Sequence, residues 1–159
     1  MIDLTVWYLQ LFFYLYTLYY KFMNINIYGS TGIIGTKTLI IIDKFFPKIK
    51  INLLCANNNA YKLIKQANYY KAKYVYLNNK KKIKILKEKL NSKTIILDYT
   101  DLQSYLKNSK SDLSILAISG YKSLYYFHSI IKNSKILGLV NKESIVSSGH
   151  LFKNYKKKI

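Results

Sequence analysis

The sequence contains no arginine. All 26 basic residues are lysine and only 7 residues are acidic, so the 159-residue chain carries a net charge of +19. Proteins that read phosphates or guanine bases usually rely on arginine, whose planar fork makes bidentate contacts. The abundant Lys, Asn, Ile and 17 Tyr residues are instead typical of A/T-biased coding. The charge therefore gives only weak support to a nucleic-acid partner, which stays an alternative that the salt dependence of binding would test.

Cysteine and proline are almost absent, with 1 residue of each. The lone Cys55 excludes an intramolecular disulfide and a cysteine-based zinc cluster, and it fits a reducing compartment. We therefore expect a cytoplasmic protein, with a plastid-type organelle as the alternative. No Pro-, Gly- or Ser-rich linker follows residue 22, and 50% of the residues are hydrophobic. This composition excludes intrinsic disorder and predicts one folded domain over residues 23–159.

The first 22 residues differ from the rest. Leu4–Tyr20 carries no charge and is dense in Leu, Phe and Tyr. This run barely approaches the roughly 20 residues that a membrane span needs, and it lacks the flanking features of a secretory signal. Three interpretations stay open: upstream sequence before a functional start at Met23, a membrane anchor, or a helix packed on the domain or on a partner. We expect residues 1–22 to be an apolar leader that is not part of the domain predicted over 23–159.

After Met23 the apolar pattern alternates between that of strands and that of helices. Runs of apolar residues at 94–97 and 113–118 are typical of parallel strands covered on both faces. Repeated strand, helix, strand order predicts an α/β, Rossmann-like, doubly wound and mainly parallel sheet with helices on both faces. The expected strands are 24–28, 49–55, 73–77, 94–97, 113–118 and 135–140, and the expected helices are 33–46, 60–71, 80–90 and 121–132.

The first expected helix carries apolar residues at helical spacing. Ile34, Thr38, Ile41 and Phe45 recur every three or four residues, which predicts that they form its buried face. Pro47 ends this helix because proline cannot continue the hydrogen-bond pattern.

A glycine-rich turn, GSTGIIG at 29–35, lies between the first expected strand and the first expected helix. In such folds a dinucleotide pyrophosphate binds at this position. Gly29 permits the tight turn, Gly32 lets backbone N–H groups approach the phosphates, and Gly35 lets the helix pack close to the strand. The spacing differs from the commoner G-x-G-x-x-G, and a glycine turn that has lost its ligand is the alternative interpretation.

The end of the second expected strand indicates which nicotinamide cofactor would bind. An NAD site normally has Asp or Glu there to bind the ribose 2′-OH, whereas Cys55-Ala56 is followed by Asn57, Asn58 and Asn59. The missing carboxylate leaves room for a 2′-phosphate, with the three amides and Lys62 as donors. We therefore expect NADPH, although an asparagine loop that merely reflects composition is the alternative.

A last motif, GLVNKES at 138–144, ends the sixth expected strand. Open α/β folds bind ligands at the carboxyl ends of their parallel strands, and Asn141, Lys142 and Glu143 would lie at that edge. An ion pair that starts a helix explains the same residues equally well.

Together these motifs resemble 1-deoxy-D-xylulose 5-phosphate reductoisomerase. The resemblance rests on MNINIYGSTGIIG, the Asn run after the second strand, Ile118-Ser119-Gly120 and LVNKESIVSSG, and it runs from about residue 23 to residue 152. It implies an NADPH- and divalent-metal-dependent oxidoreductase of isoprenoid biosynthesis that makes 2-C-methyl-D-erythritol 4-phosphate. It also implies a homodimer.

The resemblance further implies roles for individual residues. Lys142 would bind the substrate, 1-deoxy-D-xylulose 5-phosphate. Asn58 departs from the family, which usually has Lys or Arg at that position. The implied contacts with NADPH are Thr31, Gly32, Ile33 and Ile34 for its diphosphate, Asn57, Asn58 and Asn59 for its adenosine ribose phosphate, and Asn141 and Glu143 for its nicotinamide half.

Part of the family pattern is missing from the sequence. In the family the nucleotide-binding domain is followed by an Asp-Ser-Glu-His segment that holds the metal, then by catalytic and C-terminal domains. No Asp or Glu follows Glu143, so we expect no catalytic residue and no ligand for Mg²⁺ or Mn²⁺ here. The prediction is an NADPH-binding part that does not turn over alone: an N-terminal fragment, a degraded gene product, or half of a split enzyme with a complementing chain.

Overall fold

The computed structural model describes residues 23–140 and 145–146. The predicted leader 1–22 and the predicted site residues Asn141, Lys142 and Glu143 lie outside the described residues. The strands are β1 (Asn24–Tyr28), β2 (Lys50–Ala56), β3 (Tyr74–Leu77), β4 (Ile95–Leu97), β5 (Ser111–Leu116) and β6 (Ser134–Leu139). The helices are α2 (Ile33–Phe45), α3 (Ala60–Tyr70), α4 (Ile83–Lys89), α5 (Tyr99–Asn108) and α6 (Leu124–Asn133), with single 3₁₀ turns at Lys80–Lys82 and Tyr121–Ser123.

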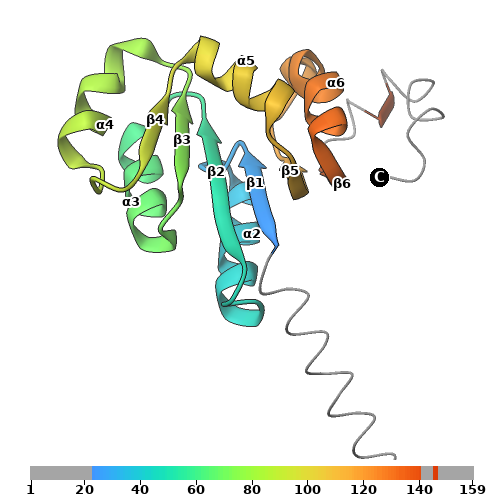
Figure 1. Ribbon diagram of the computed structural model, residues 1–159, viewed down its shortest axis with the longest axis horizontal. Coiled ribbons are helices and arrows are strands. Elements are labelled where there is room, and N and C mark those ends of the chain that lie inside the picture. The colour runs from blue at the N-terminus through green and yellow to red at the C-terminus, as the bar shows by residue number, and fades with distance from the viewer. Residues whose placement is uncertain (1–22, 141–144, 147–159) are drawn as a thin grey trace, which may run out of the picture.

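The described strands form one parallel sheet in the order β4-β3-β2-β1-β5-β6, with β1 near the middle (Figure 1). From β1 the chain moves outward through β2 and β3 to β4, and then returns to the other side of β1 with β5. The strand order therefore reverses between β1 and β5. This arrangement confirms the predicted Rossmann-like, doubly wound α/β fold.

Helices cover both faces of the sheet, because successive side chains of a buried strand point to opposite sides. On one side, α2, α3 and α4 pack on what we call the aliphatic face, whose core includes Ile25, Ile27, Leu39, Ile42, Leu54, Leu63, Val75, Leu77 and Leu86. On the other side, α5 and α6 pack on what we call the tyrosine face, whose core includes Tyr28, Leu53, Tyr76, Leu102, Tyr105, Leu116, Phe127, Ile130 and Leu137.

The prediction for the buried face of α2 is wrong. Gly35, Leu39 and Ile42 face the sheet, whereas Ile41 and Phe45 are more than half exposed. The helical spacing fits both sets, because they differ by one residue. Gly35 decides between them, since a Cβ there would lie only 2.6 Å from the Ser30 Cα atom. The side of α2 without a side chain is the side that can pack against the turn after β1.

Helix α5 is absent from the sequence prediction, which leaves residues 98–112 unassigned. Asp98 forms a capping box with Asp101: Asp98 Oδ1 accepts a hydrogen bond from the Asp101 N–H at 2.8 Å, and Asp101 Oδ2 accepts from the Asp98 N–H at 3.2 Å. Leu102, Tyr105 and Leu106 are the buried residues that follow. The sequence contained a signal for this helix: two aspartates at the spacing of a capping box, followed by apolar residues at helical spacing.

Candidate functional site

A crevice of about 800 Å³ lies at the carboxyl ends of β1, β2, β3 and β5. It sits where the strand order reverses, the place at which open α/β sheets bind their ligands. Its walls come from the glycine turn, from the loops after β2, β3 and β5, and from α5 and α6. The lining residues include Gly29, Thr31, Gly32, Cys55, Asn57, Tyr76, Asn78, Tyr99, Gln103, Ala117, Ile118, Ser119, Lys122 and Tyr126.

The glycine turn has the conformation that the sequence predicts for its first residue. Gly29 has a φ of +88°, which favours glycine, and a Cβ there would lie 2.5 Å from the Ala117 carbonyl oxygen of the loop after β5. The Gly29 and Ser30 N–H groups both donate to the Cys55 carbonyl oxygen, at 2.9 and 3.0 Å. The turn is thus held against β2 on one side and the end of β5 on the other.

Helix α2 starts in this turn and directs its amino end to the crevice. Gly32 is the N-cap residue and provides no side-chain cap, and no acidic residue lies in the first turn of the helix. The backbone N–H groups of an uncapped first turn and the positive end of the helix dipole together favour an anion. Thr31 and Gly32 line the crevice, whereas the side chains of Ile33 and Ile34 are exposed on the helix. Of the four residues predicted to bind the diphosphate, the structure thus places Thr31 and Gly32 in the crevice wall, and Ile33 and Ile34 in the first turn of α2 beside it.

The three asparagines after β2 differ in what they do. Asn57 lines the crevice, and its Oδ1 accepts a hydrogen bond from Asn78 Nδ2 at 3.0 Å. Asn58 Oδ1 accepts from Asn79 Nδ2 at 2.6 Å. Asn59 caps α3, because its Oδ1 accepts from the Lys62 N–H at 3.0 Å. These amides link the loops after β2 and β3, and Asn57 is the member of the run that faces the crevice.

Aromatic side chains form much of the crevice and are absent from the predicted site. Tyr28, Tyr76, Tyr99, Tyr125 and Tyr126 all line it. Burial, followed by the nearby Tyr126, raises the pKa of Tyr76 to about 12, and its Oη donates a hydrogen bond to Asn78 Oδ1 at 3.2 Å. The high tyrosine content appeared compositional in the sequence, and no local pattern shows which tyrosines converge.

Cys55 lies in the floor of the crevice and is 5% exposed. Burial raises the pKa of its thiol, which keeps the sulfur in its unreactive neutral form. The cysteine therefore acts as a small apolar side chain under the turn and not as a nucleophile.

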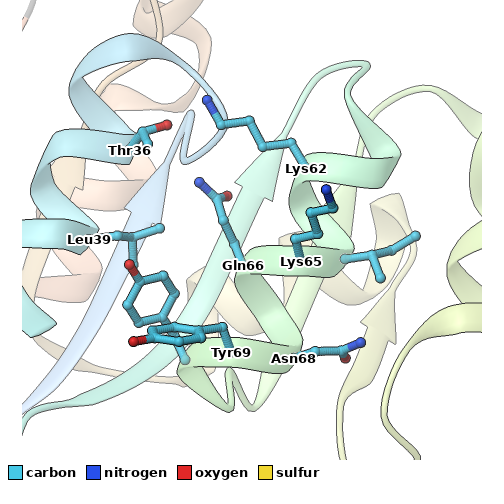
Figure 2. Close-up of a pocket in the computed structure, with 9 residues that line it drawn as sticks. Thr36, Leu39, Lys62, Lys65, Gln66, Asn68 and Tyr69 are labelled. Carbon is cyan, nitrogen blue, oxygen red and sulfur yellow. The ribbon is translucent and has the colours of Figure 1, made fainter.

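A second cavity, of about 820 Å³, lies between α2 and α3 on the aliphatic face. Figure 2 shows Thr36 and Leu39 entering it from α2, and Lys62, Gln66 and Tyr69 from α3. Gln66 is buried; its Nε2 donates to the Ser30 carbonyl oxygen at 2.9 Å, while its Oε1 has no hydrogen-bond partner. Lys62, a predicted 2′-phosphate donor, lines this cavity and not the crevice.

Metal-binding groups and membrane-spanning helices were sought among residues 23–140 and 145–146. In this part of the chain no three His, Cys, Asp or Glu side chains come together as a metal-binding group. None of the helices described combines the length and hydropathy that crossing a membrane requires.

Comparison with known proteins decides the family. The sequence model of 1-deoxy-D-xylulose 5-phosphate reductoisomerase matches residues 25–149. The chain belongs to this family. The reductoisomerase of Wigglesworthia glossinidia brevipalpis is 40% identical over 134 residues, which are 81% of this chain and 34% of that protein. The apicoplastic reductoisomerase of Plasmodium falciparum is 34% identical over 141 residues, which are 84% of this chain and 29% of that protein.

Solved structures of the reductoisomerase have the same fold. The enzyme from Zymomonas mobilis in complex with NADPH superposes with a TM-score of 0.74 at 26% identity, over 86% of this chain and 37% of that one. A complex of the enzyme with NADPH, fosmidomycin and magnesium gives a TM-score of 0.73 at 26% identity, over 85% of this chain and 34% of that one. The chain thus spans about a third of the length of the reductoisomerases that it matches.

Proposed function

We propose that residues 23–159 are the nucleotide-binding part of a 1-deoxy-D-xylulose 5-phosphate reductoisomerase and bind NADPH across the crevice. The observation that carries the proposal is the glycine turn at 29–35, which opens into the crevice where the strand order reverses. The crevice volume of about 800 Å³ lies within the usual range for cofactor sites. The Zymomonas mobilis relative, similar over 86% of this chain, is an NADPH complex.

The proposed position of the diphosphate is the amino end of α2. There the backbone N–H groups of Thr31, Gly32, Ile33 and Ile34 would neutralise its charge. A Cβ at Gly32 would meet only the Gly29 carbonyl oxygen, at 3.3 Å, so the space in front of this residue is open to a ligand. The buried Gln66 amide and the Cys55 carbonyl hold the turn from behind.

The adenosine half would extend from the turn towards Asn57, Asn58 and Asn59. No carboxylate ends β2, so nothing there repels a 2′-phosphate, and Asn57 presents its amide to the crevice. The amide links from Asn57 and Asn58 to the loop after β3 would keep this end of the site preorganised.

The nicotinamide half would lie on the β5 and β6 side. Asn141 and Glu143 would hold it and Lys142 would bind 1-deoxy-D-xylulose 5-phosphate. These residues are outside the described part, but they follow directly on Val140, whose N–H donates to the Leu116 carbonyl oxygen at the end of β5. NADPH supplies a hydride when bound, and the task of this sheet is to orient the nicotinamide towards the substrate.

The divalent cation of the family does not fit the described residues. Magnesium prefers several oxygen ligands, and the part of the chain that the structure describes contains no cluster of three metal-ligating side chains. Formation of 2-C-methyl-D-erythritol 4-phosphate for isoprenoid synthesis would require groups beyond these residues, and we place the protein in the cytoplasm or a plastid-type organelle.

Titration of the full chain with NADPH, followed by cofactor fluorescence, tests the proposal, with NADH as the comparison. Gly32→Asp places a carboxylate beside the proposed diphosphate position and is expected to weaken NADPH binding at least 30-fold, or about 2 kcal/mol. Lys65→Ser is the matched control, because it changes the net charge by the same amount but lies in the cavity between α2 and α3. Equal NADPH affinity of Gly32→Asp and the unmodified chain would contradict the assignment.

A further inference from the structure

Helix α2 has a second apolar side in addition to the one that faces the sheet. Ile34, Ile41 and Phe45 are 46%, 51% and 61% exposed, and they recur at helical spacing along one flank, which we call the α2 flank. Asp43, on the opposite side of the helix, accepts a hydrogen bond from Tyr69 Oη of α3 at 3.1 Å. The α2 flank therefore faces away from α3, towards the half of the sheet that contains β5 and β6.

That half of the aliphatic face has no helix of its own among the residues described. Helix α3 packs with β2 and β3 and α4 packs with α3, while α5 and α6 pack on the tyrosine face. Leu137 of β6 is buried under α6, so Ile136 points to the side of α2, where it is 51% exposed. The α2 flank and Ile136 thus leave apolar surface uncovered on the same side of the sheet, which is typical of an interaction surface.

The leader joins the domain beside this surface. The Met23 carbonyl oxygen accepts a hydrogen bond from the Lys50 N–H at 3.2 Å. The neighbouring Ile49 N–H donates to the Phe46 carbonyl oxygen, at the end of α2, at 3.0 Å. The Asn24 N–H donates to Asp112 Oδ2, at the start of β5, at 2.9 Å. Met23 and Asn24, the first residues described, therefore lie between the segment that follows α2 and the amino end of β5.

The composition of the leader matches the uncovered surface. Leu4–Tyr20 has 17 residues without a charge, and in helical form it would measure about 26 Å, against about 20 Å for the 13 residues of α2. Two or three residues suffice to link it to Met23. An apolar segment tethered next to an apolar surface has a high effective concentration there.

We propose that Leu4–Tyr20 packs on the α2 flank and covers it within the same molecule. In this arrangement the leader buries the side chains of Ile34, Ile41 and Phe45. The leader then fills the uncovered half of the aliphatic face, on the side of the sheet opposite the tyrosine face. This inference does not rest on cofactor binding, because the side chains of the three flank residues do not line the crevice, and the diphosphate is proposed to contact Ile34 only through its backbone N–H.

Photo-crosslinking of the full chain tests this packing. p-Benzoylphenylalanine in place of Phe45 preserves an aromatic ring on the flank, and Lys21 is the first lysine, so cleavage after lysine releases the leader as one peptide, 1–21. We expect irradiation to link residue 45 to that peptide within a monomer. The same probe at position 40, which is about 100° from position 41 around the helix, should give no such link. Links between two chains, or to detergent or lipid alone, would overturn the proposal.

Limited chymotrypsin digestion gives a second readout, because the leader is rich in Tyr, Phe and Leu. Ile41→Asp is expected to raise the rate of cleavage within residues 1–22 at least tenfold. Ile40→Asp is the control, since Ile40 is similarly exposed, at 55% against 51% for Ile41, but belongs to a different side of α2. Equal cleavage rates in the unmodified chain and both variants would overturn the proposal, and NADPH titration of each variant reports separately on the crevice.

Discussion

Two cavities of similar volume lie in different regions of the molecule, one of about 820 Å³ between α2 and α3 on the aliphatic face and one of about 800 Å³ at the carboxyl ends of the strands. The first lies between two helices and is lined by their side chains. The second lies at the strand ends, where the backbone of a glycine turn and an uncapped helix start are available. Position relative to the strand ends, and not volume, therefore distinguishes the proposed cofactor site.

The interiors of the two faces also differ. Aliphatic side chains dominate under α2, α3 and α4. The tyrosine face contains a small hydrogen-bond network. Tyr105 Oη donates to Asn26 Oδ1 at 3.0 Å and accepts from Asn52 Nδ2 at 2.6 Å. Apolar packing tolerates small shifts, whereas a buried hydrogen bond requires one geometry. The aliphatic face also contains a buried hydrogen bond, from Gln66 Nε2 to the Ser30 carbonyl oxygen, so the two interiors differ in the linked polar side chains around Tyr105.

The largest effect on stability is expected for Gly35→Ala on the aliphatic face. A Cβ at Gly35 would lie 2.6 Å from Ser30 Cα and 2.9 Å from the Ser30 carbonyl carbon, both backbone atoms that cannot move without displacing the turn. We expect a loss of about 3 kcal/mol in the free energy of unfolding, measured by urea denaturation. Gly32→Ala, with only one contact at 3.3 Å, should cost less than about 1 kcal/mol. Equal costs would show that α2 does not depend on close approach to the turn.

A smaller effect is expected on the tyrosine face from Tyr105→Phe. Losing the hydroxyl leaves buried Asn26 without its donor and should cost about 1–2 kcal/mol at pH 7. Burial raises the pKa of Tyr105 to about 12. Its stabilising effect is therefore complete below the unfolded pKa of about 10 and is lost as the pH rises through about 12.

Urea unfolding at several pH values measures this difference. The stability gap between the unmodified chain and Tyr105→Phe should narrow from pH 10 to pH 12. Tyr99→Phe, at a half-exposed tyrosine of the crevice, should change stability by less than about 0.5 kcal/mol. A gap that stays constant over this pH range would mean that the Tyr105 phenol does not gain from burial.

The smallest effect is expected for Lys62→Ala, and it concerns NADPH affinity. This substitution tests whether bound NADPH extends past the glycine turn to Lys62 on the aliphatic face. Lys62 follows the Asn59 cap in the first turn of α3 and lines the cavity between α2 and α3. If it contacts the 2′-phosphate, NADPH affinity should fall about two- to fivefold, as for an exposed ion pair, while NADH affinity stays the same. Lys65→Ala is the matched control. An equal loss of affinity for NADPH and NADH in Lys62→Ala would show that Lys62 does not contact the 2′-phosphate.

The sequence predicted much of the fold because its signals are local. The apolar runs at β2 and β5 and the glycine turn at 29–35 each depend on neighbouring residues, and the structure confirms a parallel sheet with the turn at its centre. The binding roles of Thr31, Gly32 and the asparagines stay predictions. The structure places Thr31, Gly32 and Asn57 in the crevice and gives Asn59 a capping role.

By itself, then, the sequence determined the alternation of strands and helices, the position of the glycine turn and the family, since chain periodicity and short motifs express these directly. Only the tertiary structure decided which side of α2 is buried, which tyrosines line the crevice and on which side of the sheet Lys62 lies. Two sets of residues one position apart satisfy the same helical period. The choice between them depends on the backbone that each set must approach, and that backbone comes from strands far away in the sequence.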